Sequence, residues 1–276
     1  MHPVLFIHIP KTAGTTLNHI LSHQYGWRFM WLRSDIYQNE VSRILPADIY
    51  WAMSAHQKKH YSAYAGHQTS ELIPELPYSR KIMLCRNPLD QIPSYYAHHR
   101  RHFSDSPSNL TIRKHEKLKD FLSSRSDFYP NPQVKNLFGN QIVELSNEEI
   151  EQKIEKLVSK HIDYCAPTDR FHDFVLVLAE KLNWRKNTSY KSLNASPSTI
   201  KINDKERRII EDSNLLDFYL YNEVCRKFEI LFAEHKIDFD TTVSINSSKN
   251  LIQFKVRNRI QQLITSHQTG FSLRRK

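Results

Sequence analysis

The sequence predicts an α/β protein with a central, mostly parallel β-sheet between layers of helices. Residues 4–9 form a nearly continuous apolar run, as expected for a strand buried on both faces, and residues 10–16 then interrupt it. Apolar residues return at helical spacing over 17–21. The same succession recurs where an apolar run at 81–85 is followed by a helical pattern at 90–102. Strand, loop and helix in this order are typical of a parallel sheet with helices on its faces.

Further elements are predicted along the chain in order. The first helix is expected to end at Tyr25-Gly26, and a short apolar stretch at 49–53 is interpreted as a strand. Ser146 and Glu149 form a capping box that begins the clearest helix, which is expected to run to Lys160. The remaining predicted elements are strands at 61–67 and 162–165 and helices at 171–182, 204–213 and 216–232.

The positive charge of the chain is concentrated at its carboxyl-terminal end. The 276 residues carry a net charge of +10, and seven basic residues but no acidic residue lie at 241–276. The first 240 residues are therefore close to neutral, which argues against a nucleic-acid-binding protein. We expect a single domain at 1–240 and a basic tail at 241–276, in which apolar residues of 252–264 share one helical face. Such a helix contacts a membrane surface, binds a partner or docks onto the domain, and docking is favoured.

The sequence shows neither a secretion signal nor a membrane-spanning segment. No charged region followed by an apolar one stands at the start, and no run of about 18 apolar residues is present. Taken as complete, the chain is expected to be cytoplasmic and of bacterial origin. Cys85, Cys165 and Cys225 are widely spaced within apolar segments, so we expect reduced core residues rather than disulfides or metal ligands.

The loop after the first predicted strand is rich in groups that bind anions. A loop that enters a helix presents backbone N–H groups and the positive end of the helix dipole, and Lys11 adds a full charge. This order differs from the GxxxxGK[ST] motif of nucleoside triphosphatases, because the lysine precedes the glycine. An ordinary turn with a surface lysine is the alternative interpretation. The residues expected to hold an anion, with hydroxyl donors from the threonines, are Pro10, Lys11, Thr12, Ala13, Gly14, Thr15 and Thr16.

A second candidate anion site follows the predicted strand at 81–85. Arg86 stands where this strand ends, and Ser94 follows in the next predicted helix. Because the carboxyl ends of parallel strands share one edge of a sheet, we expect this loop and the Lys11 loop to face one ligand. Two separated anion sites suit a nucleotide that carries phosphates at both ends.

These motifs resemble those of the carbohydrate sulfotransferase family, which includes the heparan sulfate 2-O-sulfotransferases and many bacterial relatives. The resemblance covers residues 4–232. Its specific motifs are Phe6–Thr16, Gly66-His67, and Arg86-Asn87-Pro88 followed by Ser94-Tyr95-Tyr96. The supporting motifs are Asn131-Pro132-Gln133, Thr168 with Phe171, and Asp217 with Leu220-Tyr221.

The resemblance implies a P-loop-like fold that binds 3′-phosphoadenosine 5′-phosphosulfate (PAPS) as a sulfuryl donor, with no metal. It implies that Pro10–Thr16 hold the 5′-phosphosulfate and that Arg86 and Ser94 hold the 3′-phosphate. Lys11 is expected to stabilise the leaving phosphate. His67, in its Gly-His context, is expected to act as the general base that accepts the proton of the acceptor hydroxyl.

Other positions qualify this interpretation. Ser196 lies in a long polar segment that is similar to a loop closing over the nucleotide in relatives. Asn87 and Gln91 depart from the family pattern, because relatives often carry an aspartate and an arginine there. The basic run 98–102 suits an anionic acceptor, such as a uronic-acid or sulfated glycan, or else forms a solvated helix face. His8 lies inside the first strand and is expected to be a packed core residue.

The sequence therefore predicts a sulfotransferase that moves a sulfuryl group from PAPS to a hydroxyl of a saccharide or glycolipid. A non-catalytic nucleotide- or polyanion-binding protein on the same scaffold is the alternative from another class. A P-loop-type kinase is the enzymatic alternative, disfavoured because the Lys-Ser/Thr pair that holds phosphate and magnesium is missing. The sequence leaves the acceptor and the oligomeric state open.

Overall fold

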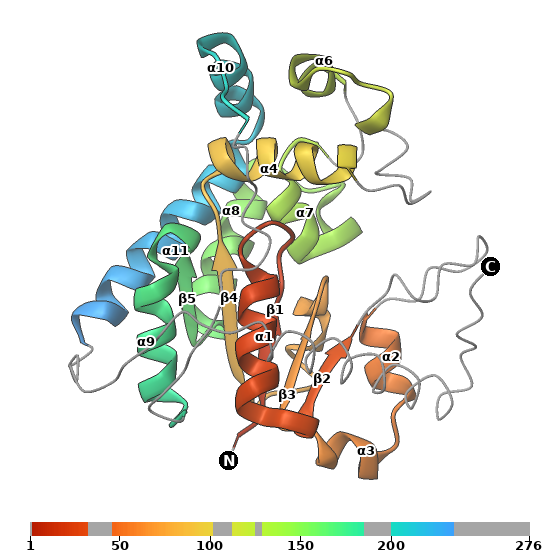
Figure 1. Cartoon of the computed structure of the whole chain (residues 1–276), viewed down its shortest axis with the longest axis vertical. Helices are drawn as coiled ribbons and strands as arrows, with labels where there is room; N and C mark the ends of the chain where they lie inside the picture. Colours follow the sequence, from red (N-terminus) through yellow and green to blue (C-terminus); the bar gives the residue numbers. More distant parts are fainter. Residues whose placement is uncertain (1, 33–45, 102–111, 125–128, 185–199, 235–276) are drawn as a thin grey trace.

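The computed structural model describes residues 2–32, 46–101, 112–124, 129–184 and 200–234. Its centre is a five-stranded sheet with the order β2-β3-β1-β4-β5, in which neighbouring strands are parallel (Figure 1). The strands are β1 (Val4–Ile7), β2 (Phe29–Leu32), β3 (Ala63–Gly66), β4 (Arg80–Cys85) and β5 (Tyr164–Pro167). Helices cover both faces of the sheet, so the predicted α/β fold with three layers is confirmed.

The helices fall into three groups by what they pack against. On one face of the sheet lie α1 (Gly14–Tyr25) and α9 (Phe171–Lys181). The opposite face is covered by α2 (Pro46–Ala52), α7 (Pro132–Phe138), α8 (Asn147–Lys156) and much of α11 (Leu215–Ala233). A third group, near the carboxyl ends of the strands, consists of α4 (Pro88–Arg101), α6 (Leu118–Ser123) and α10 (Asp204–Ser213), while α3 (Ala55–His60) lies near the other end (Figure 1).

The centre of the sheet is fully buried because β1 is apolar on both faces. Val4 and Phe6 belong to the core under α1 and α9, whereas Leu5 and Ile7 belong to the core on the other face. All four side chains are at most 1% exposed. This two-sided burial is the reason why the strand has a continuous apolar pattern rather than an alternating one.

Most predicted elements agree with the structure, but one predicted strand is wrong, and β2, α3, α6 and α7 were not predicted. Residues 49–53 were interpreted as a strand but belong to α2 and the residue after it. Ile49, Tyr50 and Met53 are buried while Trp51 is 47% exposed, which is the spacing of one helical face and not the alternation of a strand. The apolar side chains alone did not distinguish the two, because the stretch is short.

The predicted capping box is present at the start of α8. Ser146 accepts a hydrogen bond from the Glu149 N–H, and the Glu149 carboxylate accepts one from the Ser146 N–H. The helix continues into a π-helical turn, η4 (Leu157–His161), before β5 begins. The three cysteines are free, with Cys85 and Cys165 buried and Cys225 half-buried.

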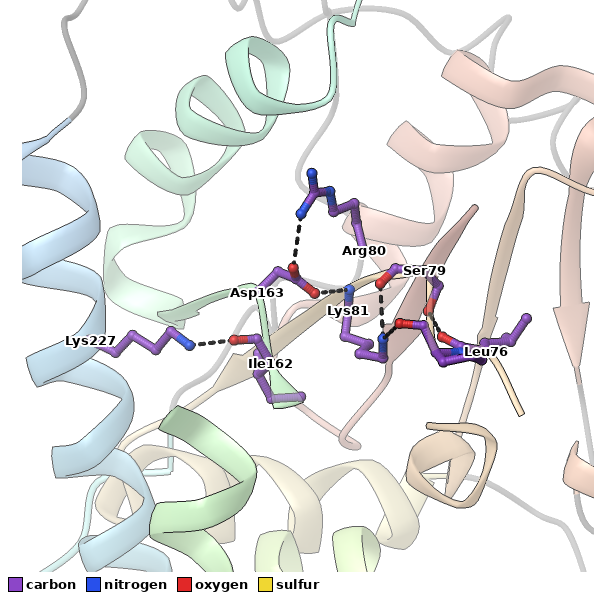
Figure 2. A network of polar contacts seen from close by, with 8 residues as sticks. Leu76, Ser79, Arg80, Lys81, Ile162, Asp163 and Lys227 are labelled. Atoms are coloured by element: carbon purple, nitrogen blue, oxygen red, sulfur yellow. Dashed lines mark hydrogen bonds and ion pairs between the residues drawn. The ribbon is translucent and has the colours of Figure 1, made fainter. Parts of the chain in front are cut away.

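A network of polar contacts joins β4 and β5 at their amino ends (Figure 2). Asp163 accepts a hydrogen bond from the Lys81 N–H at 2.8 Å and pairs with Arg80 at 3.2 Å. The Lys81 ammonium group donates to the carbonyls of Pro77 and Ser79. Lys227 of α11 donates to the carbonyl of Val158, within η4, and to the carbonyl of Ile162, which directly follows η4. These contacts use every charge for the chain's own backbone or carboxylates, so this end of the sheet is held together structurally.

The predicted tail at 241–276, with its amphipathic helix, lies outside the described residues, as does Ser196. Among the helices that the structure describes, none combines the length and the apolar character needed to cross a membrane.

Candidate functional site

The order of the strands places a topological switch point between β1 and β4. These strands are neighbours, but the chain leaves β1 toward β2 on one side of the sheet and leaves β4 toward β5 on the other. The two loops therefore diverge, and a crevice outside the carboxyl ends at such a point is where open α/β sheets bind ligands. Helix α4 lies across this end of the sheet, next to the β1–α1 loop (Figure 1).

The β1–α1 loop has a strained backbone. Lys11 and Ala13 adopt positive φ angles of 67° and 61°, although neither is glycine. Such residues cost about 1 kcal/mol or more each and are concentrated at binding and catalytic sites. The Thr12 hydroxyl donates to the Ile9 carbonyl at 2.8 Å, so its proton is committed to the loop itself rather than directed outward.

Gly14 brings the start of α1 against the His8 ring. A Cβ atom at Gly14 would lie 1.9 Å from His8 Cδ2 and 2.0 Å from His8 Nε2. The glycine is therefore required by a close approach and not by a positive φ. The loop and the beginning of α1 are thus held at a fixed distance from β1.

Two cationic side chains meet at this loop. The Arg86 guanidinium Nη1 donates to the Lys11 carbonyl at 3.3 Å, and both side chains are half-buried. Burial lowers the pKa of Lys11, and the charges of Arg101 and Arg86 lower it further. Burial also lowers the pKa of Arg86, whereas Asp90 raises it. Like charges held together in this way are relieved by a bound anion.

Gln91 contacts the same loop from α4. Its Nε2 donates to the Pro10 carbonyl at 3.2 Å, and the side chain is buried. Its Oε1 has no hydrogen-bond partner in the described part of the chain. The glutamine at this position therefore joins α4 to the loop through a neutral contact.

His67 stands immediately after β3 and faces His8 of the neighbouring chain segment. The two ring centroids are 4.3 Å apart, and His67 Nδ1 lies 2.8 Å from the His8 carbonyl oxygen. A carbonyl only accepts, so Nδ1 carries the proton and Nε2 of the neutral ring carries the lone pair. This is the tautomer that a general base at Nε2 requires.

A buried glutamine positions Arg86, and sequence reasoning noted its motif without finding this role. Gln133 Oε1 accepts a hydrogen bond from the Arg86 N–H at 3.0 Å, and its Nε2 donates to the Arg86 carbonyl at 2.7 Å. The Cys85 thiol also donates to Oε1, at 3.1 Å. Because Gln133 is fully buried, these contacts fix the backbone at the point where β4 becomes the loop.

Asp217 of α11 in turn holds the beginning of α7. Its carboxylate accepts hydrogen bonds from the backbone N–H groups of Gln133 (3.0 Å) and Val134 (2.8 Å). Asn131 and Asn214 complete the junction, because Asn131 Oδ1 accepts from the Asp217 N–H and Asn214 Oδ1 accepts from the Asn131 N–H. Burial raises the pKa of Asp217 to about 7, although its hydrogen bonds with the backbone lower it.

The structure brings most of the predicted site residues to one edge of the sheet. Pro10–Thr16, His67 and Arg86 all lie at the carboxyl ends of β1, β3 and β4, with Thr15 half-buried and Thr16 buried in the first turn of α1. Ser94 is half-buried in α4, and no hydrogen bond connects it to Arg86 within the described residues. Arg101, which acts electrostatically on Lys11, was considered only as part of a basic run.

The described residues contain no group of three or more His, Cys, Asp and Glu side chains arranged to hold a metal ion. Comparison with protein-family models and with curated proteins finds no match to this chain. The site combines a cationic loop with a histidine whose Nδ1 is hydrogen-bonded to the His8 carbonyl.

Proposed function

We propose that this protein is a sulfotransferase that uses PAPS to sulfate a hydroxyl of a saccharide or glycolipid. The observation that carries the proposal is the combination of a strained cationic loop at the Lys11 position with a histidine held in the tautomer of a base. A kinase of the P-loop type needs a Lys-Ser/Thr pair for phosphate and magnesium, and this loop lacks it.

The residues present suit a donor that is anionic at both ends. Lys11, the backbone of the loop and the N-terminus of α1, which has no acidic residue in its first turn, would hold the phosphosulfate. Arg86 is close enough to the same loop to act on a second phosphate without a separate domain. PAPS supplies an activated sulfuryl group on a phosphate leaving group.

The chain's own part in the reaction is positioning and proton transfer. Lys11 offsets the negative charge that develops on the leaving oxygen, as cationic clamps do in phosphoryl transfer. His67 Nε2 accepts the proton of the acceptor hydroxyl, while Nδ1 keeps its hydrogen bond to the His8 carbonyl. Gln133 holds the Arg86 backbone so that the second cation stays in place.

The first experiment is calorimetric titration of 3′-phosphoadenosine 5′-phosphate (PAP) in the absence of magnesium. We expect wild type to bind and Arg86→Ala to bind at least about tenfold more weakly, because a charge-assisted hydrogen bond is lost. Arg80→Ala is a matched control from the other end of β4. Arg80 forms a partly exposed ion pair with Asp163, so its loss should cost little stability. Because Arg80 begins β4 and the candidate site follows the end of β4, PAP affinity should stay unchanged.

Transfer is then measured with wild type and His67→Gln on a panel of saccharides and glycolipids. Loss of transfer with retained PAP binding supports His67 as the base. Magnesium-dependent binding of ATP in place of PAP would favour a kinase. PAP binding by a folded wild type that transfers to no acceptor would favour a non-catalytic binding protein, and no PAP binding would overturn the proposal.

A further inference from the structure

The ring of His8 is enclosed by polar and aromatic groups behind the proposed base. It stacks on Phe6, with centroids 5.3 Å apart and planes at 15°, and it also contacts the His67 ring, with centroids 4.3 Å apart and planes at 35°. Gly14 presses against its Cδ2–Nε2 edge. His8 is only 5% exposed, so the prediction of a packed residue is confirmed. It packs against residues of the candidate site, namely His67 and Gly14.

Asn18 of α1 faces the remaining ring nitrogen. Its Nδ2 lies 3.4 Å from His8 Nδ1, and the side chain is fully buried. The Asn18 Oδ1 atom has no hydrogen-bond partner among the residues that the structure describes. An unsatisfied buried acceptor costs roughly 1–3 kcal/mol, so this asparagine lowers stability where an apolar residue would not.

Two imidazoles with ring centroids 4.3 Å apart do not both become charged, because each imidazolium raises the free energy of protonating the other. The titratable groups that act on His8 are His67, which follows β3, and Lys11, on the loop after β1. Burial, first, and then these two charges lower the pKa of His8. An amide N–H directed at Nδ1 adds to this, since it stabilises the lone pair of the neutral ring.

We propose that Asn18 is a positioning residue that keeps His8 uncharged, so that the single proton that the His8–His67 pair accepts goes to His67. This inference rests on the proposed function in one respect, the role of His67 as the base. When the O–H bond of the acceptor breaks, the new N–H bond forms on His67 Nε2, and His8 remains a neutral ring beneath the imidazolium. Without Asn18, the buried ring competes for that proton.

The test is a ¹⁵N NMR pH titration of histidine-labelled full-length protein without nucleotide, with His8→Gln and His67→Gln used to assign resonances. In wild type, His67 is expected to titrate as the Nδ1–H tautomer and His8 to stay neutral from pH 5 to 8. Asn18→Asp places a carboxylate opposite His8 Nδ1, so that His8 holds a proton and the apparent pKa of His67 falls by about one unit, a tenfold change. Asn18→Leu removes the amide without adding a charge, so His8 should take up part of the proton and the titration of His67 should shift in the same direction by a smaller amount. A wild-type His67 titration in folded Asn18→Leu also overturns the inference.

The acid limb of the transfer rate should move to lower pH in Asn18→Asp by the same amount, with PAP affinity within about threefold of wild type. An unchanged His67 titration in folded Asn18→Asp overturns the inference. If Asn18→Asp does not fold, the wild-type titration decides, because a His8 that is protonated between pH 5 and 8 also overturns it. Expected titrations without any transfer activity would instead refute the proposed function and leave the assignment of the proton standing.

Discussion

Replacing Gly14 with alanine tests whether the His8 ring sets the position of the anion-binding loop. The added methyl carbon would lie 1.9 Å from His8 Cδ2, far inside the 3.4 Å at which ordinary contact begins. His8 has little room to retreat, because it is only 5% exposed and its ring packs against both Phe6 and His67. The start of α1 must therefore shift by about 1.5 Å, and overpacking of this kind typically costs about 1–3 kcal/mol.

A second effect of Gly14→Ala acts in the opposite direction. Alanine favours the helix over glycine by up to about 1 kcal/mol, so the expected net loss of unfolding free energy is about 1–2 kcal/mol. The displaced loop should also weaken PAP binding by at least about tenfold, since N–H donors and Lys11 move together. Urea unfolding and calorimetry measure the two effects.

A double-mutant cycle separates the steric explanation from any other. In a His8→Ala background the ring is absent, so Gly14→Ala should no longer destabilise the protein and should retain its helix-propensity gain. The expected coupling energy is about 2 kcal/mol. If Gly14→Ala lowers the unfolding free energy equally in both backgrounds, the contact between the loop and His8 does not carry the effect, and the reasoning is refuted.

Three further predictions concern residues away from the loop. Asp217→Asn should remove a pH dependence of stability: the folded pKa of about 7 exceeds the unfolded value of 3.8, so folded wild type holds a proton that the unfolded chain has lost. Between these values, wild-type unfolding free energy should fall as pH rises, by up to about 1.4 kcal/mol per pH unit, whereas the variant should lack this decline in urea unfolding at pH 4–7. Gln133→Leu leaves the backbone N–H and carbonyl of Arg86 without their hydrogen bonds, so we expect the unfolding free energy to fall by about 2–4 kcal/mol. PAP binding should also weaken, although Gln133 itself is not expected to contact the nucleotide. Unaltered PAP affinity in a folded variant would contradict this. Ser146→Ala removes the cap of α8 and should cost about 1 kcal/mol in thermal unfolding without any effect on PAP affinity.

The sequence by itself determined the fold class and predicted the place of the candidate site. Continuous apolar runs at β1 and β4 identified strands buried on both faces, and the polar loops after them predicted the edge at which we propose that the ligand binds. The capping box of α8 and the extent of α10 followed from local rules as well, because those rules involve residues three or four positions apart. These features depend only on the types of residues that lie a few positions apart in the sequence.

The tertiary structure decided which of the polar residues act together. The contact between Gln133 and Arg86 joins residues far apart in the chain, and nothing in the local pattern of either indicates a partner. His8 was expected as core, yet only the parallel pairing of β1 with β3 places it against His67, and only the packing of α1 places Asn18 against its ring. The interpretation of 49–53 as a strand failed for a related reason, since a short apolar stretch becomes helix or strand according to the surface it packs on. Strand pairing and helix packing join residues that are far apart in the sequence, and these contacts bring the separate motifs together in one candidate site.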